Sequence, residues 1–285
     1  KSIGPKAFYY CKSLKIANIS SQIITIEQKM FSECTSLESV YISSNTITMV
    51  NESSFSNCKE LSIFDCPGTI TYFAGWAFYQ CGKLSFVNTS NDISYIGKSA
   101  FYNCNLTSFN ITGSISSIAP YAFYSNYYMS SVTISDNVTS IYEYAFYSCI
   151  NMKALNIPKG VTLIGKSAFD NCKGLTSIDI PEGISIINES VFASIYGITS
   201  IIIPESVEII GVNAFQYCHN VNSITMPKNV KEICSGAFSG TSITNFSIPE
   251  QITIISESLF ASCSNLSLIA LHTNIEEIQW SAFSY

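Results

Sequence analysis

The sequence predicts an elongated solenoid of stacked coils, in which each coil gives one short strand to a parallel β-sheet. Three observations lead to this prediction. Phenylalanine recurs every 22 to 24 residues along the 285-residue chain, other apolar residues keep fixed offsets from it, and most prolines follow the same segment of the repeat. A unit of this length cannot bury its own apolar face, but stacked units can, because each column of side chains then meets itself in the next coil.

The repeat is marked by thirteen phenylalanines and therefore spans twelve periods. Alanine precedes the phenylalanine in nine of the units. The marks are Phe8, Phe31, Phe55, Phe78, Phe101, Phe123, Phe146, Phe169, Phe192, Phe215, Phe238, Phe260 and Phe283.

A strand is expected after each phenylalanine. An apolar residue stands five or six positions later, and two more follow at alternate positions, as in Ile178 and Ile180. Alternation of β-branched residues is typical of a short strand. Proline cannot donate to a ladder and marks the strand's end. Six of the eight prolines stand there: Pro67, Pro158, Pro181, Pro204, Pro227 and Pro249.

The convex side is expected to hold shorter elements. A second apolar pair, such as Val138 and Ile141, precedes the next phenylalanine and predicts another short strand. The Ser-Ala-Phe-x-x-Cys segment is too short for a full helix, so we expect a one- to two-turn helix or a 3₁₀ turn. A serine occupies the position of a helix cap in four units. These serines are Ser99, Ser167, Ser190 and Ser258.

Two units contain only 22 residues, those beginning at Phe101 and Phe238. Each lacks one residue between its phenylalanine and the following Leu106 or Ile243. We expect a loop deletion that leaves the core columns intact.

The bulk properties exclude some classes of protein. Hydrophobic residues make up 47% of the chain and charged residues 12%, yet polar residues interrupt every apolar run before it could span a membrane. The net charge of −6 is spread without blocks, so a basic footprint for nucleic acid is missing. Residues 1–285 are expected to form one repeat domain. Because both ends fall inside a repeat, we expect a fragment of a longer chain without its caps, whose open ends could self-associate.

The repeat pattern Leu-x-x-Ile-x-Ile-Pro-x-x-Val-x-x-Ile-Gly-x-x-Ala-Phe-x-x-Cys resembles the BspA-type leucine-rich repeat. The resemblance implies a right-handed leucine-rich-repeat horseshoe of about twelve repeats, with the parallel sheet on its concave face. That family includes cell-surface and secreted proteins of bacteria and parasitic protists, often implicated in adhesion to host cells or matrix. The resemblance carries no catalytic residue to this chain.

A column of cysteines stands three residues after the phenylalanines. Disulfides between coils are disfavoured, because the Cβ vectors of stacked residues would run parallel. The spacing fits no zinc signature. We therefore expect buried free thiols that act as small core residues. The column contains Cys11, Cys34, Cys58, Cys81, Cys104, Cys149, Cys172, Cys218 and Cys263.

Catalytic, cofactor and metal sites are not expected. The two histidines, His219 and His272, lie more than two repeats apart, so a nucleophilic triad is hard to assemble. Residues 160–167 match a phosphate-loop pattern formally. However, Val161 and Ile164 are core positions of the repeat, which denies the motif its usual loop context.

Two surfaces are candidates for binding protein or glycan. The first is the concave face, which is mostly small, polar and uncharged; a merely solvated sheet face is an equally good interpretation. Its candidates are Tyr41, Asp65, Asn110, Ser131, Thr133, Asn156, Ser177, Asp179, Ile202 and Thr225.

The second is a tyrosine patch on the convex side or its edges. Exposed tyrosine offers contact area at low entropic cost. Alternatively, neighbouring tyrosines stack on one another and cover the convex turns. The patch contains Tyr102, Tyr124, Tyr127, Tyr128, Tyr144 and Tyr147.

The sequence thus favours a non-enzymatic adhesion module of a cell-surface or secreted protein, with a host surface or matrix as its expected partner. Two alternatives stay open. One is a structural protein that self-associates into a surface layer. The other is an intracellular interaction scaffold, which the free cysteines favour, because reducing compartments keep thiols.

Overall fold

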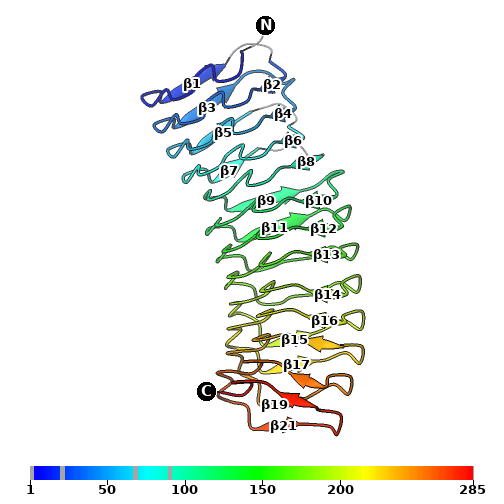
Figure 1. Ribbon diagram of the computed structural model, residues 1–285. Coiled ribbons are helices and arrows are strands. Elements are labelled where there is room, and N and C mark those ends of the chain that lie inside the picture. Colours follow the sequence, from blue (N-terminus) through cyan, green and yellow to red (C-terminus); the bar gives the residue numbers. More distant parts are fainter. Residues whose placement is uncertain (1–2, 20–22, 67–69, 89–91, 285) are drawn as a thin grey trace.

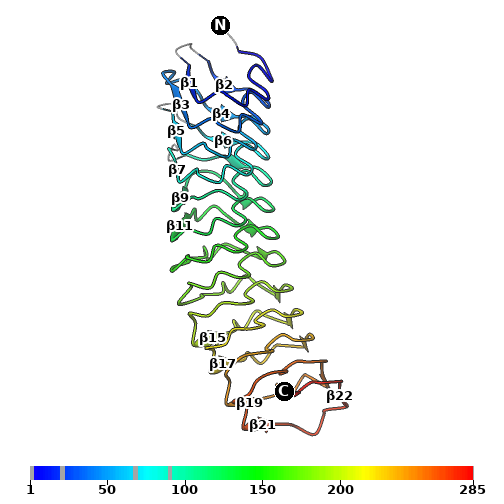
Figure 2. The same cartoon turned by 90° about the vertical axis from the view of Figure 1, so that its left-hand side faces the viewer.

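The computed structural model describes residues 3–19, 23–66, 70–88 and 92–284. Its coils stack in sequence order from the N-terminus to the C-terminus into an elongated, gently twisting column (Figure 1, Figure 2). Two rows of strands run along this column, and both rows pair in parallel. The predicted leucine-rich-repeat solenoid is confirmed.

The long-strand row comes from the Leu-x-x-Ile-x-Ile segments and forms the face predicted to be concave. Alternate side chains enter the core, as in β11, where Val132 and Ile134 are buried and Ser131 and Thr133 are exposed. The row contains β1 (Ile16–Ile19), β3 (Ser39–Ile42), β5 (Ile63–Asp65), β7 (Phe86–Val87), β9 (Ser108–Ile111), β11 (Ser131–Ile134), β15 (Ser200–Ile202), β17 (Ser223–Thr225), β19 (Asn245–Ser247) and β21 (Leu268–Ala270).

The short-strand row precedes each phenylalanine, as the second apolar pair predicts. Each strand has two residues, and only the second is buried in most of them. The row contains β2 (Thr25–Ile26), β4 (Met49–Val50), β6 (Tyr72–Phe73), β8 (Tyr95–Ile96), β10 (Ser117–Ile118), β12 (Ser140–Ile141), β13 (Leu163–Ile164), β14 (Ile186–Ile187), β16 (Ile209–Ile210), β18 (Glu232–Ile233), β20 (Ile254–Ile255) and β22 (Glu277–Ile278).

The phenylalanines form a continuous stack through the core. Phe169 and Phe192 lie 5.9 Å apart with their rings 3° from parallel, and neighbouring units repeat this geometry. Phe169 has no exposed surface. Because apolar burial contributes about 25 cal/mol per Å², this column and the leucine and isoleucine columns beside it hold the coils together.

The predicted short helices are wrong for the described residues, where the segment around each phenylalanine is a chain of turns. The residues two before and two after the phenylalanine adopt left-handed backbone angles, as in Ser167 (φ 50°) and Asn171 (φ 63°). A helix needs consecutive right-handed residues. Ser99, Ser190 and Ser258 share this left-handed geometry and therefore are not helix caps.

Hydrogen bonding between coils explains why turns replace a helix here. The backbone N–H groups of Ser167, Phe169 and Asn171 donate to carbonyls of the next coil, at 2.9, 3.0 and 3.0 Å. A helix would consume these donors internally. The same three bonds occur at all twelve boundaries between consecutive phenylalanine units, always from one coil to the next one along the chain. We call these segments the turn column.

Both strand rows are interrupted at the two 22-residue units. β7 does not pair with β9, nor β8 with β10; likewise β17 does not pair with β19, nor β18 with β20. The core columns nevertheless stay buried, as predicted. A phenylalanine fills the first inward-facing strand position of each shortened unit, Phe109 in β9 and Phe246 in β19. Each packs against the phenylalanine that marks the next unit, at 5.0 and 4.9 Å between ring centroids.

Candidate binding surfaces

The ten residues predicted for the concave face are all exposed on the long-strand row or its continuation. Neighbours in register include Tyr41 with Asp65, and Ile202 with Thr225. Because the row is interrupted, however, these residues do not form one continuous sheet face. Paired segments end after β7, after β11 and after β17.

An apolar ladder on the same face was missed by sequence reasoning. Phe86 is 61% exposed and stands in register with Ile63, which is also exposed. Ile16, two coils before Ile63, is exposed at the same strand position. The signal was present in the sequence, because these residues occupy the outward strand position that serine fills in other units. A small hollow of about 280 Å³ lies beside Ile63, Asp65 and Phe86.

The tyrosine patch is organised as a stack. Tyr79, Tyr102, Tyr124 and Tyr147 each follow a phenylalanine, and their ring centroids lie 4.9, 4.6 and 4.7 Å apart. Tyr79 was not among the predicted residues. The side chains are half-buried, so the rings stack on one another and also keep part of their surface exposed.

A second tyrosine pair widens this surface. Tyr121 and Tyr144 stack at 4.9 Å, and Tyr144 meets Tyr147 edge-on at 5.8 Å. We call these six residues the tyrosine ladder: Tyr79, Tyr102, Tyr121, Tyr124, Tyr144 and Tyr147. Burial, with the neighbouring hydroxyls of Tyr102 and Tyr147, raises the pKa of Tyr124 to about 12. The phenol of Tyr124 is therefore a neutral hydrogen-bonding group at physiological pH.

Tyr127 and Tyr128 stand apart from the stacked rows. Both are exposed, Tyr128 by 58%. They lie on the turn that follows the Phe123 segment, four and five residues beyond the phenylalanine. The predicted patch thus divides into a rigid, stacked part and two free rings at its edge.

The cysteine column consists of free thiols, buried except for Cys11 in the first coil. Eight of them share one contact: their Sγ atoms donate to the carbonyl oxygen of the phenylalanine in the preceding coil, at 3.0 to 3.4 Å. Burial raises the pKa of Cys149 and Cys218 to about 12, which keeps them as inert thiols. Cysteine in this column therefore satisfies a buried carbonyl as well as filling space.

Other chemistry finds little support. Within the described residues, no group of three or more His, Cys, Asp or Glu side chains could hold a metal ion. The formal phosphate-loop segment contains buried Val161 and Ile164, and a Cβ on Gly165 would lie 2.5 Å from the backbone nitrogen of Glu143. That glycine is explained by close coil packing. Within the same residues, no helix is long and apolar enough to cross a membrane.

Asp170 follows Phe169, so it occupies the repeat position that Tyr147 holds one coil earlier. Burial raises the pKa of its carboxyl to about 6, although hydrogen bonds from Ser167 and Asn171 oppose the rise. The folded state thus binds the proton more tightly than the unfolded chain. Wild-type stability is therefore expected to increase as the pH falls from about 6 to about 4.

We expect Asp170→Asn to raise the free energy of unfolding by about 1–2 kcal/mol at pH 7.5, and to lose this advantage at pH 4. The gain stays below the full linkage value, because the carboxyl is partly exposed and solvent screens it. Urea unfolding at both pH values measures it. Asp179→Asn, at an exposed position, serves as the control and should change stability by less than about 0.5 kcal/mol. An equal effect of Asp170→Asn at both pH values would contradict the burial argument.

Comparison with known proteins decides the family. The family profile for the BspA type leucine rich repeat region, in six copies, matches residues 1–130, 116–198 and 185–285. The chain belongs to this family. Among curated proteins, none matches this chain significantly. Leucine-rich-repeat solenoids of this family are generally non-enzymatic.

Three solved structures resemble this BspA-type solenoid. A leucine-rich cell surface protein from Faecalibacterium prausnitzii is 25% identical with a TM-score of 0.58, covering 98% of this chain and 82% of that one. A leucine-rich repeat protein from Bacteroides ovatus is 19% identical with a TM-score of 0.65, covering 98% and 78%. The pneumococcal vaccine antigen PcpA is 15% identical with a TM-score of 0.53, covering 98% and 81%. The last two show the fold alone.

Proposed function

We propose that this chain is the adhesive, non-enzymatic repeat region of a cell-surface or secreted protein, and that it recognises protein or glycan on a host surface or matrix. The tyrosine ladder carries the proposal. Six tyrosines on neighbouring coils form an aromatic surface whose rings are fixed by stacking. Rings that are already ordered lose little entropy when a ligand packs against them.

The family supports the location of this activity. The Faecalibacterium protein, described as a cell surface protein, matches 98% of this chain. A BspA-type repeat offers extended faces for contact rather than an enclosed catalytic pocket. The exposed pair Tyr127 and Tyr128 extends the aromatic surface toward the long-strand row, which bears the second candidate face.

The test is a binding screen of the whole protein against immobilised matrix proteins and a glycan array. We expect the triple substitution of Tyr124, Tyr128 and Tyr147 by Ser to weaken binding more than tenfold. The double variant Tyr124→Phe and Tyr147→Phe keeps the rings and should retain binding if stacking contacts dominate. Tyr9→Ser and Tyr217→Ser, at exposed positions outside the ladder, serve as matched controls.

Folding of every variant is checked by its thermal unfolding transition. Unchanged binding by the folded triple variant would show that the ladder is not the binding surface. In that case Phe86→Ala with Ile63→Ala tests the apolar ladder of the long-strand row. A protein that binds no matrix component or glycan in the screen would overturn the adhesive function itself.

A further inference from the structure

The boundary between the coils of Phe215 and Phe238 lacks strand pairing in both rows. Between the coil of β17 and β18 and the coil of β19 and β20, the strands of neither row are paired. Single hydrogen bonds flank the unpaired strands: the N–H of Ser242 donates to the carbonyl of Val221 at 2.9 Å, and the hydroxyl of Ser256 donates to the carbonyl of Ile233 at 2.6 Å. The turn column stays closed there, because the N–H of Phe215 donates to the carbonyl of Ala237 at 2.9 Å, and the rings of Phe215 and Phe238 still stack at 5.9 Å. The two coils are therefore joined at the turn column and at the flanking bonds, while the facing edges of β17 and β19 stay unpaired.

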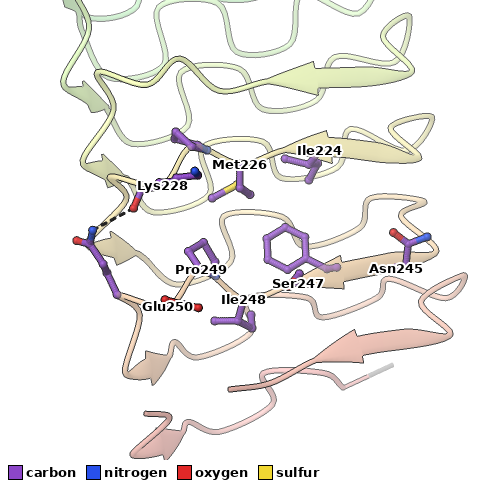
Figure 3. Close-up of a pocket in the computed structure, with 11 residues that line it drawn as sticks. Ile224, Met226, Lys228, Asn245, Ser247, Ile248, Pro249 and Glu250 are labelled. Carbon is purple, nitrogen blue, oxygen red and sulfur yellow. Dashed lines mark hydrogen bonds between the residues drawn. The ribbon is translucent and has the colours of Figure 1, made fainter. Parts of the chain in front are cut away.

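The opening on the long-strand row is a groove of about 750 Å³. It lies between Ile224, Met226 and Lys228 on one coil and Asn245, Ser247 and the segment up to Gln251 on the other (Figure 3). Figure 3 also shows β17 and β19 more widely separated than β19 and β21. We call this groove the β17–β19 slot.

The backbone directions show which groups face the slot. The N–H of Ile203 donates to the carbonyl of Thr225 at 3.0 Å, so the backbone of Thr225 is directed toward β15. Backbone groups alternate in direction along a strand. Those of the neighbouring Ile224 and Met226 are therefore directed toward β19.

The other edge follows from the same argument. The N–H of Ile248 donates to the carbonyl of Ala270 at 3.1 Å, toward β21. The N–H and carbonyl of Ser247 are therefore directed toward β17. No backbone hydrogen bond joins residues 223–226 to residues 245–248, all of which the structure describes. Two strand edges with complementary donors and acceptors thus face each other across the slot.

We propose that the β17–β19 slot binds one extended segment of a partner protein, which inserts as an additional strand between β17 and β19. Main-chain hydrogen bonding specifies a polypeptide, because only a chain with regularly spaced N–H and C=O groups can serve both edges at once. Half-buried Ile224 and Met226, together with the buried ring of Phe246, give an apolar floor for alternate side chains of the segment.

The ends of the slot limit the segment. Lys228 and Glu250, of opposite charge, line the end where the strands finish. The side-chain amide of Gln251 donates to the carbonyl of Lys228 at 3.0 Å and bridges the two coils there (Figure 3, dashed line). The segment is therefore short, about as long as the strands beside it, without a strong preference for net charge. This proposal concerns other residues than the tyrosine ladder, so either can fail alone.

The test selects peptides for the whole protein from a displayed library of nonapeptides with alternating apolar and polar positions. Selected peptides are then synthesised twice, once unmodified and once with alternate backbone amides N-methylated. We expect the unmodified peptides to bind in fluorescence anisotropy and the methylated versions to bind at least tenfold more weakly. Methylation removes main-chain donors and leaves the side chains unchanged.

Two protein variants locate the binding. Ser247→Pro removes the N–H that faces β17 and leaves the donor of Ile248 to β21 in place, so it should weaken peptide binding at least tenfold. Ser247→Ala keeps that N–H and should stay within about twofold of wild type. If Ser247→Pro fails to fold, hydrogen exchange on the wild type replaces it, and peptide should then protect the amides of Ile224, Met226 and Ser247.

Three outcomes would overturn the proposal. The first is a library from which no peptide is enriched over scrambled sequences. The second is equal binding of methylated and unmodified peptides. The third is self-association of the protein that Ser247→Pro abolishes, since it would make a second copy of this chain the occupant in place of a partner protein.

Discussion

Replacing Phe169 by Ala is expected to lower the free energy of unfolding by about 3–5 kcal/mol, the range for a large aromatic residue removed from a packed core. Phe169 is fully buried and stacks on Phe146 and Phe192, at 5.5 and 5.9 Å. Its loss leaves a cavity between rings that the turn column holds at fixed positions, so neighbouring coils can collapse only partly. Urea unfolding followed by circular dichroism measures the change.

The matched control is Phe86→Ala, which removes the same atoms from a side chain that is 61% exposed. We expect it to cost less than about 1 kcal/mol, because little area leaves the core. Each coil touches only its neighbours, so hydrogen exchange in Phe169→Ala should rise most in the coils of Phe146, Phe169 and Phe192. Similar costs for both substitutions would contradict the view that the phenylalanine stack holds the solenoid together.

The second large effect is expected at Asn126, which replaces cysteine in its column. Its side-chain nitrogen donates to the carbonyls of Phe101 and Phe123, at 2.8 and 2.9 Å, and its oxygen accepts the N–H of Leu106 at 3.3 Å. In full-length units the leucine N–H donates to the cysteine carbonyl three residues earlier, as Leu37 does to Cys34 at 3.0 Å. Leu106 follows Cys104 by only two positions, so the shortened unit lacks this bond and the side chain of Asn126 provides the acceptor instead.

Asn126→Ala should therefore lower the free energy of unfolding by about 2–4 kcal/mol, because it leaves buried backbone groups without partners. Asn126→Cys restores the column's usual thiol contact to Phe101 but not the acceptor for Leu106, so an intermediate loss is expected. Asn151→Ala removes one exposed hydrogen bond, to Tyr127, and should cost less than about 1 kcal/mol. Chemical denaturation of the three variants measures these losses. Equal stability of the Ala and Cys variants would contradict the assigned role of the thiol contact.

The fold was predictable because the phenylalanine spacing is a direct record of stacking. A residue that recurs every 22 to 24 positions, as Phe169 and Phe192 do, meets its own copy only in a solenoid. The turn column was not predictable from the same pattern. Ser167 followed by Ala168 and Phe169 fits a helix start locally, but the hydrogen bonds that decide its conformation run to the next coil, which local propensity does not register.

The candidate surfaces divide in the same way. Tyr102, Tyr124 and Tyr147 follow successive phenylalanines, so their stacking could be anticipated from spacing, whereas the free rings of Tyr127 and Tyr128 depend on turn geometry. The β17–β19 slot could not be anticipated. The deletion before Ile243 is visible in the sequence, but the sequence does not show that the facing edges of β17 and β19 stay unpaired.

The one-way hydrogen bonds of the turn column have an electrical consequence. The three N–H groups that each turn segment donates are all directed toward the following coil. Their peptide dipoles therefore add along the axis, as the dipoles of a helix do, and do not cancel. Within the turn column, one side of each coil is therefore rich in donors and the other in acceptors. Two such rods are matched when they meet head-to-tail, whereas a head-to-head meeting sets like groups against each other, so the solenoid has an intrinsic direction for any end-on assembly.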